Sequence, residues 1–502
     1  MGALAQLPAY DKGMRGRDAA LAGLVVTFPY KRSLSGHCVF SSEPRMPNRE
    51  HFVKRSRIDA SPQAVYDWHM RPGALERLIP PWSHIRVLEY QGGVRDRGRV
   101  VLEFPIGPRR IRWVAEHLDI QPGRSFTDIQ VEGPFALWRH THLVQETTDH
   151  ACMLEDRVEY LLPAGRVVRS VASEIVKNRL APYFEYRHQT VRHDLLMQRP
   201  FTDAPPMRVL VSGSTGFIGS ALVPLLTTAG HTVEPLVRPG RELQGIKWDP
   251  RTGELDPSAA GADAVIHLAA MNIGKHRWTS ARKQQIRDSR VTSTRLLCQT
   301  LAKLNPKPRV LIAASAVGYY GDRGDEWLDE RSEPGRGFLP ETCAAWEEAT
   351  HVAADAGIRV VNLRIGIVLS PRGGALRRMI QPFRFGLGGP VGSGNQYLSW
   401  ISIDDVIGAI YHALMTPDLH GPVNATAPNP VTYREFARVL GRVLMRPAVV
   451  TMPATAARLL FGEMADEVIL ASARVRPMRL MQNGYCFRHE SVEAALRHVL
   501  GR

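Results

Sequence analysis

The stretch "VSGSTGFIGS", residues 211–220, contains three glycines and begins at the last residue of the apolar run "MRVLV", residues 207–211. A continuous apolar run is typical of a parallel strand that is buried on both faces. Gly213 permits a tight turn, Gly216 lets the main chain approach a diphosphate, and Gly219 allows close helix packing. The helix that follows would present free N–H groups to the phosphates. The predicted cofactor-binding residues of this turn are Gly213, Ser214, Thr215, Gly216, Phe217, Ile218 and Gly219.

Apolar runs and helical segments alternate along the chain after this turn. Helical spacing is present in "FIGSALVPLLTTAGH", although Pro224 should cost a hydrogen bond or produce a kink. Further helical segments are expected at 279–304 and 340–356. The next strands expected are "HTVEPLVRP", "ADAVIHLAA" (262–270), "PRVLIAASA" (308–316) and "IRVVNLRIGIVL" (358–369). This order predicts an α/β fold with a doubly wound parallel Rossmann sheet.

The end of the second strand favours NADP over NAD, with NAD as the second choice. An acidic residue at this place would accept a hydrogen bond from the ribose 2′-hydroxyl. The strand ends instead in "PLVRP", and Arg238 is suited to pair with a 2′-phosphate. The alternative is that Arg238 is a solvated loop residue. Small residues at the end of another strand, Leu268, Ala269 and Ala270, are also expected beside the cofactor.

The part of the chain before this domain has a different pattern of apolar and polar residues. Residues 50–198 begin with an alternating stretch and a helix-start signal at "DASP", and continue with six strand-like stretches separated by Gly and Pro. A long helical segment at about 168–197 ends this part. Helix, antiparallel strands and a long C-terminal helix form an α+β order.

The remaining boundaries follow from composition. Residues 1–45 lack sustained periodicity and are expected to be a disordered tail. Residues 199–206 are expected to be a linker, because Pro205 and Pro206 stiffen the chain. The nucleotide domain is expected at 207–445, and a small helical segment at 446–502.

The composition fits a soluble globular protein of 502 residues, with 44% hydrophobic and 23% charged residues. The net charge of +15 is compatible with nucleic-acid binding, but arginines and acids are interleaved along the chain, which favours no nucleic-acid partner. Five widely spaced cysteines without a C-x-x-C argue against disulfides or a zinc site, and no metal site is predicted. No apolar run is long enough to span a membrane. These observations predict a cytoplasmic protein that acts on a small molecule.

Several long motifs of the second half occur together and in order. They include "GSTGFIGSALV", "HLAAMNIGKHRW", "SAVGYYGD", "TCAAWEEA" and "FGLGGPVGSGNQYLSWISIDDV". This half resembles the atypical extended short-chain dehydrogenase/reductases, which are often labelled epimerase-family proteins. The segment "MPATAARLLFGEMADEVILASARVRPMRL" is similar to the small C-terminal domain of that family. The resemblance implies an NAD(P)-binding Rossmann domain.

The first half resembles the START-like, polyketide-cyclase (SRPBCC) superfamily with a helix-grip fold. The resemblance is carried by the element order and by "IDASPQAVYDW" and "FEYRHQTVRHDL". It implies a curved sheet around the long helix and an apolar cavity. A bound apolar ligand and a simple packed partner domain are equally compatible with this part.

Ordinary members of the short-chain dehydrogenase/reductases use a tyrosine with a lysine four residues later, and this pair is missing. None of the 13 tyrosines has a lysine at that position. In the matching helix, "ETCAAWEEA", Cys343 takes the place of the tyrosine and Glu347 that of the lysine. The helical spacing is retained, but a glutamate would raise rather than lower the pKa of its neighbour.

Each candidate replacement has a structural alternative. Cys343 is an acid/base candidate or a small packed residue, and Glu347 is an acid/base candidate or part of a surface ion pair. Ser315 would hold a substrate carbonyl or serve packing. Tyr320, in the "YG" phrase of the family, would line the substrate pocket or be structural. Arg364 in "LRIG" would contact the substrate or form a structural ion pair.

Two functions from different classes follow. The first is an NADP-dependent oxidoreductase or epimerase-like enzyme that transfers protons through a nonstandard group. The second is a nucleotide-binding sensor or scaffold in which the START-like domain holds an apolar ligand. The motifs for cofactor binding carry more weight than those for turnover.

Overall fold

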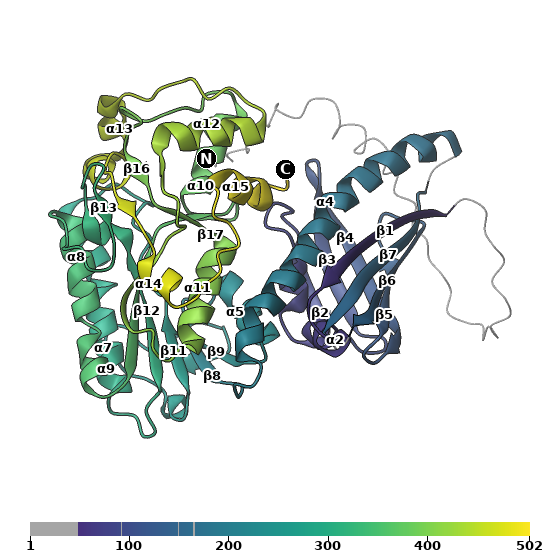
Figure 1. Cartoon of the computed structure of the whole chain (residues 1–502), viewed down its shortest axis with the longest axis horizontal. Helices are drawn as coiled ribbons and strands as arrows, with labels where there is room; N and C mark the ends of the chain where they lie inside the picture. The colour runs from purple at the N-terminus through teal and green to yellow at the C-terminus, as the bar shows by residue number, and fades with distance from the viewer. Residues whose placement is uncertain (1–48, 92, 149, 164–165) are drawn as a thin grey trace, which may run out of the picture. The chain divides into compact units, whose positions relative to one another are not determined.

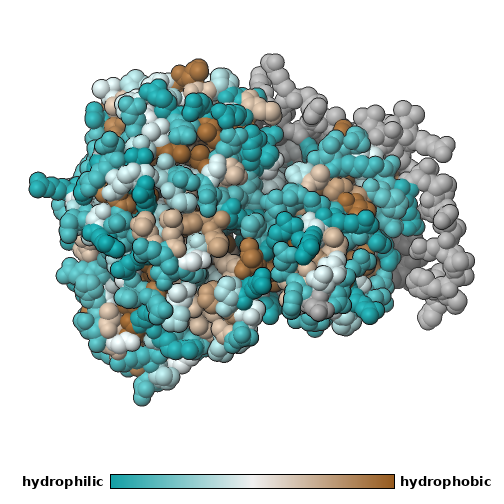
Figure 2. Space-filling view, in the orientation of Figure 1, coloured by the Kyte–Doolittle hydropathy of each residue, from teal (hydrophilic) through white to brown (hydrophobic). Residues whose placement is uncertain are grey.

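The computed structural model describes residues 49–91, 93–148, 150–163 and 166–502, so the tail predicted at 1–45 lies outside the described residues. The chain divides into two compact units. Among the described residues, unit 1 comprises 49–70 and 83–189, and unit 2 comprises 71–82 and 190–502. Hydrophilic residues cover most of the face drawn in Figure 2, and apolar side chains form separate patches on it. Within the described ranges, no helix has the length and apolar character needed to cross a membrane.

Unit 1 is built on a seven-stranded sheet with the order β1-β7-β6-β5-β4-β3-β2 (Figure 1). Every pair of neighbouring strands is antiparallel. The strands are β1 (Glu50–Ile58), β2 (Arg86–Gln91), β3 (Arg99–Ile106), β4 (Arg109–Gln121), β5 (Ser125–Glu132), β6 (Leu137–Thr148) and β7 (Ala151–Leu161). Each strand predicted from the alternation of apolar and polar residues is present.

Two helices complete the predicted order, α2 (Pro62–Met70) and α4 (Arg166–Gln198), and the last part of α4, residues 190–198, belongs to unit 2. Ser61 begins α2, where its hydroxyl accepts a hydrogen bond of 3.3 Å from the backbone N–H of Ala64. Apolar residues of α4, among them Val176 and Phe184, pack against Val158 and Tyr160 of β7. Burial of this face therefore holds the long helix against the sheet.

Unit 2 contains a seven-stranded sheet with the order β10-β9-β8-β11-β12-β14-β18, and every neighbouring pair is parallel. The strands are β8 (Arg208–Ser212), β9 (Thr232–Val237), β10 (Ile246–Lys247), β11 (Ala264–His267), β12 (Val310–Ala316), β14 (Arg359–Ile365) and β18 (Gly421–Ala425). The chain runs from β8 outward to β10 and then returns to β11 on the other side of β8. Ligands of such Rossmann-like sheets bind where the order reverses, beyond the carboxyl ends of the strands.

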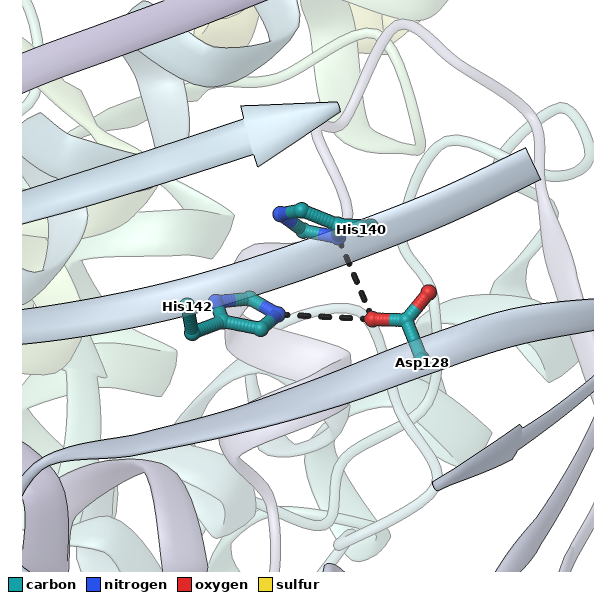
Figure 3. Close-up of side chains that lie close together, drawn as sticks. All are labelled: Asp128, His140 and His142. Atoms are coloured by element: carbon teal, nitrogen blue, oxygen red, sulfur yellow. Dashed lines mark ion pairs between the residues drawn. The ribbon is translucent and has the colours of Figure 1, made fainter. Parts of the chain in front are cut away.

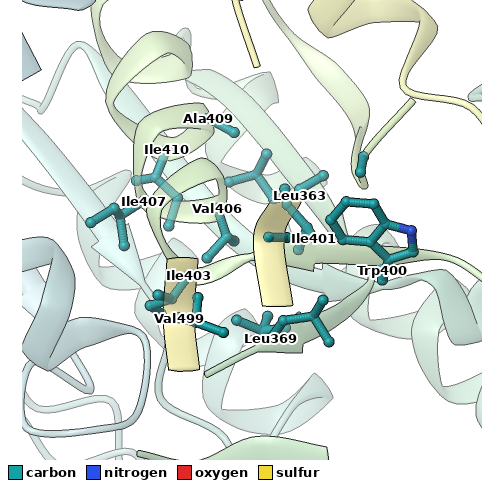
Figure 4. Close-up of a cluster of buried hydrophobic side chains, with 14 of the residues drawn as sticks. Leu363, Leu369, Trp400, Ile401, Ile403, Val406, Ile407, Ala409, Ile410 and Val499 are labelled. Atoms are coloured by element: carbon teal, nitrogen blue, oxygen red, sulfur yellow. The ribbon is translucent and has the colours of Figure 1, made fainter. Parts of the chain in front are cut away.

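Helices cover both faces of this sheet because its strands are apolar on both faces. Val209 and Val211 belong to a core with α5 (Gly219–Thr228) and α11 (Ile403–Met415), whereas Leu210 packs with α7 (Val291–Leu301) on the other face. Figure 4 shows the first core, where side chains of α11 lie beside Leu363 and Trp400. The predicted doubly wound architecture is confirmed for this unit.

The structure corrects several predicted boundaries. The segment 279–304 is divided into α6 (Ser280–Asp288) and α7, and 340–356 into α8 (Phe338–Glu348) and α9 (His351–Asp355). The strand predicted at 358–369 ends at Ile365, and β15 (Ile367–Leu369) pairs instead with β17 (Trp400–Ser402). Gly366 lies between them, where a Cβ atom would be 2.5 Å from the carbonyl oxygen of Ser399. Helix α5 continues through Pro224 to Thr228.

The remaining elements of unit 2 lie mostly after β14. The helices are α10 (Gly374–Arg384), α12 (Tyr433–Leu444), α13 (Ala454–Phe461), α14 (Met478–Gln482) and α15 (Val492–Leu500). The short strands are β13 (Trp327–Leu328), β16 (Tyr397–Leu398), β19 (Val431–Thr432) and β20 (Arg474–Val475). The single-turn elements are η1 (Arg199–Phe201), which lies in the predicted linker, η2 (Pro257–Ala259), η3 (Val317–Tyr320) and η4 (Ala465–Ile469).

Residues 71–82, which contain α3 (Ala74–Leu78), pack with unit 2 although they lie early in the chain. The buried guanidinium of Arg77 donates two hydrogen bonds, of 2.9 and 2.6 Å, to the carboxylate of Asp194. It also donates a hydrogen bond of 3.3 Å to Asp404. A buried charge of this kind needs its partners, so the ion pairs fix the segment to unit 2.

Candidate functional site

The glycine turn after β8 lies at the point where the strand order reverses. Gly213 has a φ of +73°, and a Cβ atom there would be 3.0 Å from the backbone nitrogen of Ala269. A Cβ atom on Gly219 would be only 2.2 Å from the carbonyl oxygen of Gly213. Both positions therefore require glycine, as the sequence predicts, and the turn is pressed against the chain that leaves β11.

Among the described residues, the N-terminus of α5 lacks a capping side chain. Thr215 and Gly216, in the turn before it, are exposed. An uncapped helix end offers its first N–H groups and the positive end of its dipole to an anion. The backbone N–H groups of Gly216, Ser220 and Ala221 already donate within the turn, so the diphosphate of a dinucleotide would interact with the helix dipole and with the remaining N–H groups.

A buried network of hydrogen-bonded side chains lies next to the turn. The hydroxyl of Ser212 lies 2.7 Å from Nδ1 of His267 and accepts a hydrogen bond of 3.2 Å from the backbone N–H of Ala269. Nε2 of His267 lies 3.1 Å from the hydroxyl of Thr294, which also accepts a hydrogen bond from the indole of Trp346. Burial lowers the pKa of His267 to about 4, so the ring is uncharged near neutral pH. This network fixes Leu268, Ala269 and Ala270 beside the turn.

Three arginines surround a pocket of about 350 Å³ after β9. Arg238, which the sequence predicts, is joined by Arg241 and Arg251, and Asp249 is the single acidic residue of the lining. Asp249 accepts a hydrogen bond of 2.9 Å from the backbone N–H of Arg251. Three guanidinium groups against one carboxylate leave a cationic pocket that suits a phosphate group. Sequence reasoning missed Arg241, which follows Arg238 in the same loop, and Arg251, which only the fold brings to this place from the segment after β10.

Three of the other predicted residues form one buried cluster at the carboxyl ends of β12 and β14. Arg364 donates two hydrogen bonds to the carboxylate of Glu347, with distances of 2.9 and 2.8 Å. The hydroxyl of Ser315 donates a third, of 2.6 Å, to the same carboxylate. Glu347 and Arg364 therefore form the ion pair that was one of the alternatives, but the pair is buried rather than on the surface. These three donors occupy both oxygens of the Glu347 carboxylate.

Tyr320 is also held by this cluster. Its hydroxyl accepts a hydrogen bond of 3.0 Å from Arg364 and lies 2.7 Å from the side-chain oxygen of Asn424. Burial raises the pKa of Tyr320 to about 12, so its hydroxyl stays protonated. The neighbouring Tyr319 is half-buried, and the guanidinium of Arg364 lies 3.5 Å from its ring centroid.

Cys343 lies one helical turn before Glu347 on α8. It is 3% exposed, and burial raises the pKa of its thiol to about 12. A Cβ atom on Gly318 would lie 3.9 Å from its sulfur, so the thiol packs against η3. This environment favours the packing interpretation of Cys343 over an acid/base role.

The sequence of this chain matches two families. The profile of the NAD dependent epimerase/dehydratase family matches residues 209–425, and the profile of a domain of unknown function (DUF1731) matches residues 452–499. An epimerase family protein of Mycobacterium bovis is 45% identical over 296 residues, which cover 59% of this chain and 98% of that protein.

Two solved structures are similar to this chain at 34% sequence identity. The nucleoside-diphosphate sugar epimerase of Corynebacterium glutamicum has a TM-score of 0.72, and the likeness covers 90% of each chain. Human epimerase family protein SDR39U1 (isoform 2), solved with NADPH, has a TM-score of 0.53 and covers 59% of this chain and 99% of its own. The matched region of the first structure is too long to lie in unit 2 alone, so it includes much of unit 1. The matched region of the second structure is no longer than unit 2.

Proposed function

Because this chain belongs to the epimerase family, we propose that it is an NADP-dependent oxidoreductase or epimerase-like enzyme that acts on a carbonyl or hydroxyl group. The observation that carries the proposal is the open glycine turn at the reversal of the sheet, followed by the arginine pocket after β9. The human relative solved with NADPH supports the same cofactor. When bound, the nicotinamide would supply or accept a hydride.

Different residues of unit 2 would bind different parts of the cofactor. The turn from Gly213 to Gly219 would hold the diphosphate, and Arg238 with its two neighbouring arginines would hold the 2′-phosphate. Leu268, Ala269 and Ala270 would lie along the dinucleotide at the end of β11. The cluster of Ser315, Glu347 and Arg364 would form the floor of the site, since its polar groups are satisfied by one another.

Proton transfer must then use a group other than the Tyr-x-x-x-Lys pair. Of the predicted candidates, Cys343 is buried as a thiol, and Glu347 and Tyr320 are held in hydrogen bonds. Tyr319 is half-buried, and its ring lies over the guanidinium of Arg364. Burial raises the pKa of Tyr319, and the charge of Arg364 opposes this shift only in part. Because Tyr319 is less buried than Tyr320 and Cys343, we place it first among the proton donors of this site.

The burial and hydrogen bonding of Cys343, Glu347 and Tyr320 favour the second function, a nucleotide-binding sensor. A nucleotide-binding sensor needs the cofactor site but no mobile proton carrier, and the locked Glu347 fits that description. The two functions differ in one measurement. The full chain is mixed with NADPH and a panel of carbonyl compounds that includes nucleoside-diphosphate sugars, and the absorbance of the reduced nicotinamide is followed. Oxidation by any member supports the oxidoreductase, and conversion of a nucleoside-diphosphate sugar into its epimer without net oxidation supports the epimerase-like enzyme. Binding with neither change across the panel supports the sensor.

Replacing Arg238 with aspartate tests the choice of cofactor. The substitution puts a negative charge where the 2′-phosphate would lie, so the Kd for NADPH should rise at least about tenfold more than the Kd for NADH. Fluorescence titration of both cofactors measures the change. Arg295, exposed on α7, provides the control, because Arg295→Asp makes the same change of charge away from the pocket. An equal loss for NADPH and NADH would contradict the assignment.

For unit 1 we propose a START-like helix-grip domain that holds an apolar ligand. Its antiparallel sheet, packed against the long helix α4, supports this assignment. The ligand would contact an aromatic group in which Trp113, Phe135 and Trp138 have ring centroids 4.9 to 5.6 Å apart.

Tryptophan fluorescence of the full chain tests this assignment. A saturable change on addition of a long-chain fatty acid is expected, and the change should disappear in Trp138→Ala. A matched control is Trp327→Ala, which removes an exposed tryptophan from unit 2. A wild-type signal that does not respond would leave unit 1 as a packed partner domain.

A further inference from the structure

We propose that unit 1 contains a binding site for a divalent first-row transition metal ion, with Asp128, His140 and His142 as its protein ligands. Each of these side chains offers one ligand atom, and the three atoms lie within 4.8 Å of one another. Figure 3 shows both imidazole rings directed at the carboxylate of Asp128. The site is separate from the cofactor site and does not depend on the proposed function.

Strand register brings these residues together. His140 and His142 are two positions apart on β6 and so point to the same face of the sheet. Asp128 on β5 lies directly opposite His140, and Asp156 on β7 lies directly opposite His142. Two carboxylates and two imidazoles therefore meet on one face without any irregularity of the strands.

The distances suit an ion between the rings and Asp128. Oδ1 of Asp128 lies 3.1 Å from Nδ1 of His140 and 3.4 Å from Nε2 of His142. Ligands at about 2.0–2.2 Å from a tetrahedral zinc ion are about 3.3–3.6 Å apart, so the ring nitrogens need to move only slightly to bind one. Both histidine side chains are only 4% exposed.

Asp156 would not bind the ion itself but would pair with the second nitrogen of each histidine ligand. Its Oδ1 lies 3.0 Å from Nε2 of His140 and 2.7 Å from Nδ1 of His142, the ring nitrogens that face away from Asp128. Its Oδ2 lies 2.8 Å from Nε2 of His188 on α4. Metal-binding histidines commonly pair their second nitrogen with a carboxylate in this way, which orients the ring.

The cluster also has a polar atom without a proper partner. Nδ1 of His142 is buried and forms no hydrogen bond of acceptable geometry, although Asp156 is only 2.7 Å away. Two neutral imidazoles carry two protons for the four contacts they make with carboxylates, so two contacts would place lone pairs against each other. A metal ion between Asp128 and the rings would accept the lone pairs of the two ring nitrogens that face Asp128, and it would leave the protons on the two nitrogens that face Asp156.

The sequence predicts no metal site, and the metal ion proposed for unit 1 departs from that prediction. The wide cysteine spacing excludes a C-x-x-C site but does not bear on a site of imidazole and carboxylate ligands. The "HTH" of β6 is a spacing signal for two ligands on one strand face, but it becomes meaningful only when β5 is paired beside it.

Zinc binding to the full chain tests the proposal. After treatment with EDTA, calorimetry with Zn²⁺ should show one ion per chain with a Kd of about 1 μM or lower. Asp128→Asn and His142→Gln should each weaken this binding at least about 100-fold. The matched controls Asp119→Asn and His51→Gln, at exposed positions of the same sheet, should bind as the wild type does.

A second readout needs no variant. Co²⁺ in place of Zn²⁺ should give the intense visible absorption of a four- or five-coordinate site, without the near-ultraviolet band of a thiolate ligand. Weak octahedral bands, or zinc binding that is unchanged in Asp128→Asn and His142→Gln, would overturn the proposal. So would the absence of stoichiometric binding to the wild type, in which case a proton neutralises the cluster.

Discussion

Gly216→Val is expected to weaken NADPH binding at least about 100-fold while the protein remains folded. Gly216 is exposed in the turn before α5, and apart from its two chain neighbours the described atoms within 4 Å of an added Cβ belong to Gly213. The nearest of these, the carbonyl oxygen, would be 3.0 Å away. The side chain would therefore occupy the space of the diphosphate rather than clash with the core. A 100-fold loss corresponds to about 2.7 kcal/mol of binding free energy.

Calorimetric titration measures the affinity of Gly216→Val for NADPH, and its thermal unfolding midpoint shows whether the protein remains folded. Ala354→Val is the control, since it enlarges an exposed residue on α9, the helix that leads to the amino end of β14. Gly216→Ala should give an intermediate loss. If Gly216→Val bound NADPH like the wild type, the diphosphate would not lie at this turn.

Glu347→Leu is expected to destabilise the protein by about 3–5 kcal/mol, because it leaves the guanidinium of Arg364 buried without its carboxylate. Arg364 is 3% exposed and donates two hydrogen bonds to Glu347, and Ser315 loses its acceptor as well. The midpoint of urea unfolding, followed by tryptophan fluorescence, measures the loss. Arg364 would be left with Tyr320 as its hydrogen-bond partner in this cluster.

The adjacent Glu348 provides a matched control, because it is exposed on the same helix and Glu348→Leu should change the stability little. In the double variant Glu347→Leu/Arg364→Met, both charges are removed and much of the lost stability should return. A stable Glu347→Leu protein that binds NADPH but has lost its activity would contradict the structural role and place Glu347 in proton transfer.

The parts of the site that sequence could predict depend on short stretches of chain. The glycine turn, the strand before it and the helix after it are continuous in sequence, so their periodicity and glycine spacing specify the local structure. The strands of unit 1 were predictable for the same reason, because alternation of apolar and polar residues has a period of two. The position of Arg238 directly after β9 was predictable, and its contact with a 2′-phosphate stays a prediction.

The parts that could not be predicted depend on pairing between distant segments. Glu347 and Arg364 are 17 positions apart and meet only because α8 packs beside β12 and β14. Helical spacing with Cys343 suggested an acid/base pair, whereas tertiary packing directs Glu347 to Arg364. The same limit applies to Asp128, His140 and His142, whose proximity follows from strand register.

Direct calorimetric titration of the full chain with NADPH tests the central claim, that the main chain around Gly213–Gly219 binds the diphosphate of a nicotinamide dinucleotide. The account predicts saturable binding at one site per chain, with a Kd in the micromolar range or lower and at least about tenfold weaker binding of NADH. No detectable binding of either dinucleotide would contradict the account, whatever the family likeness of the chain.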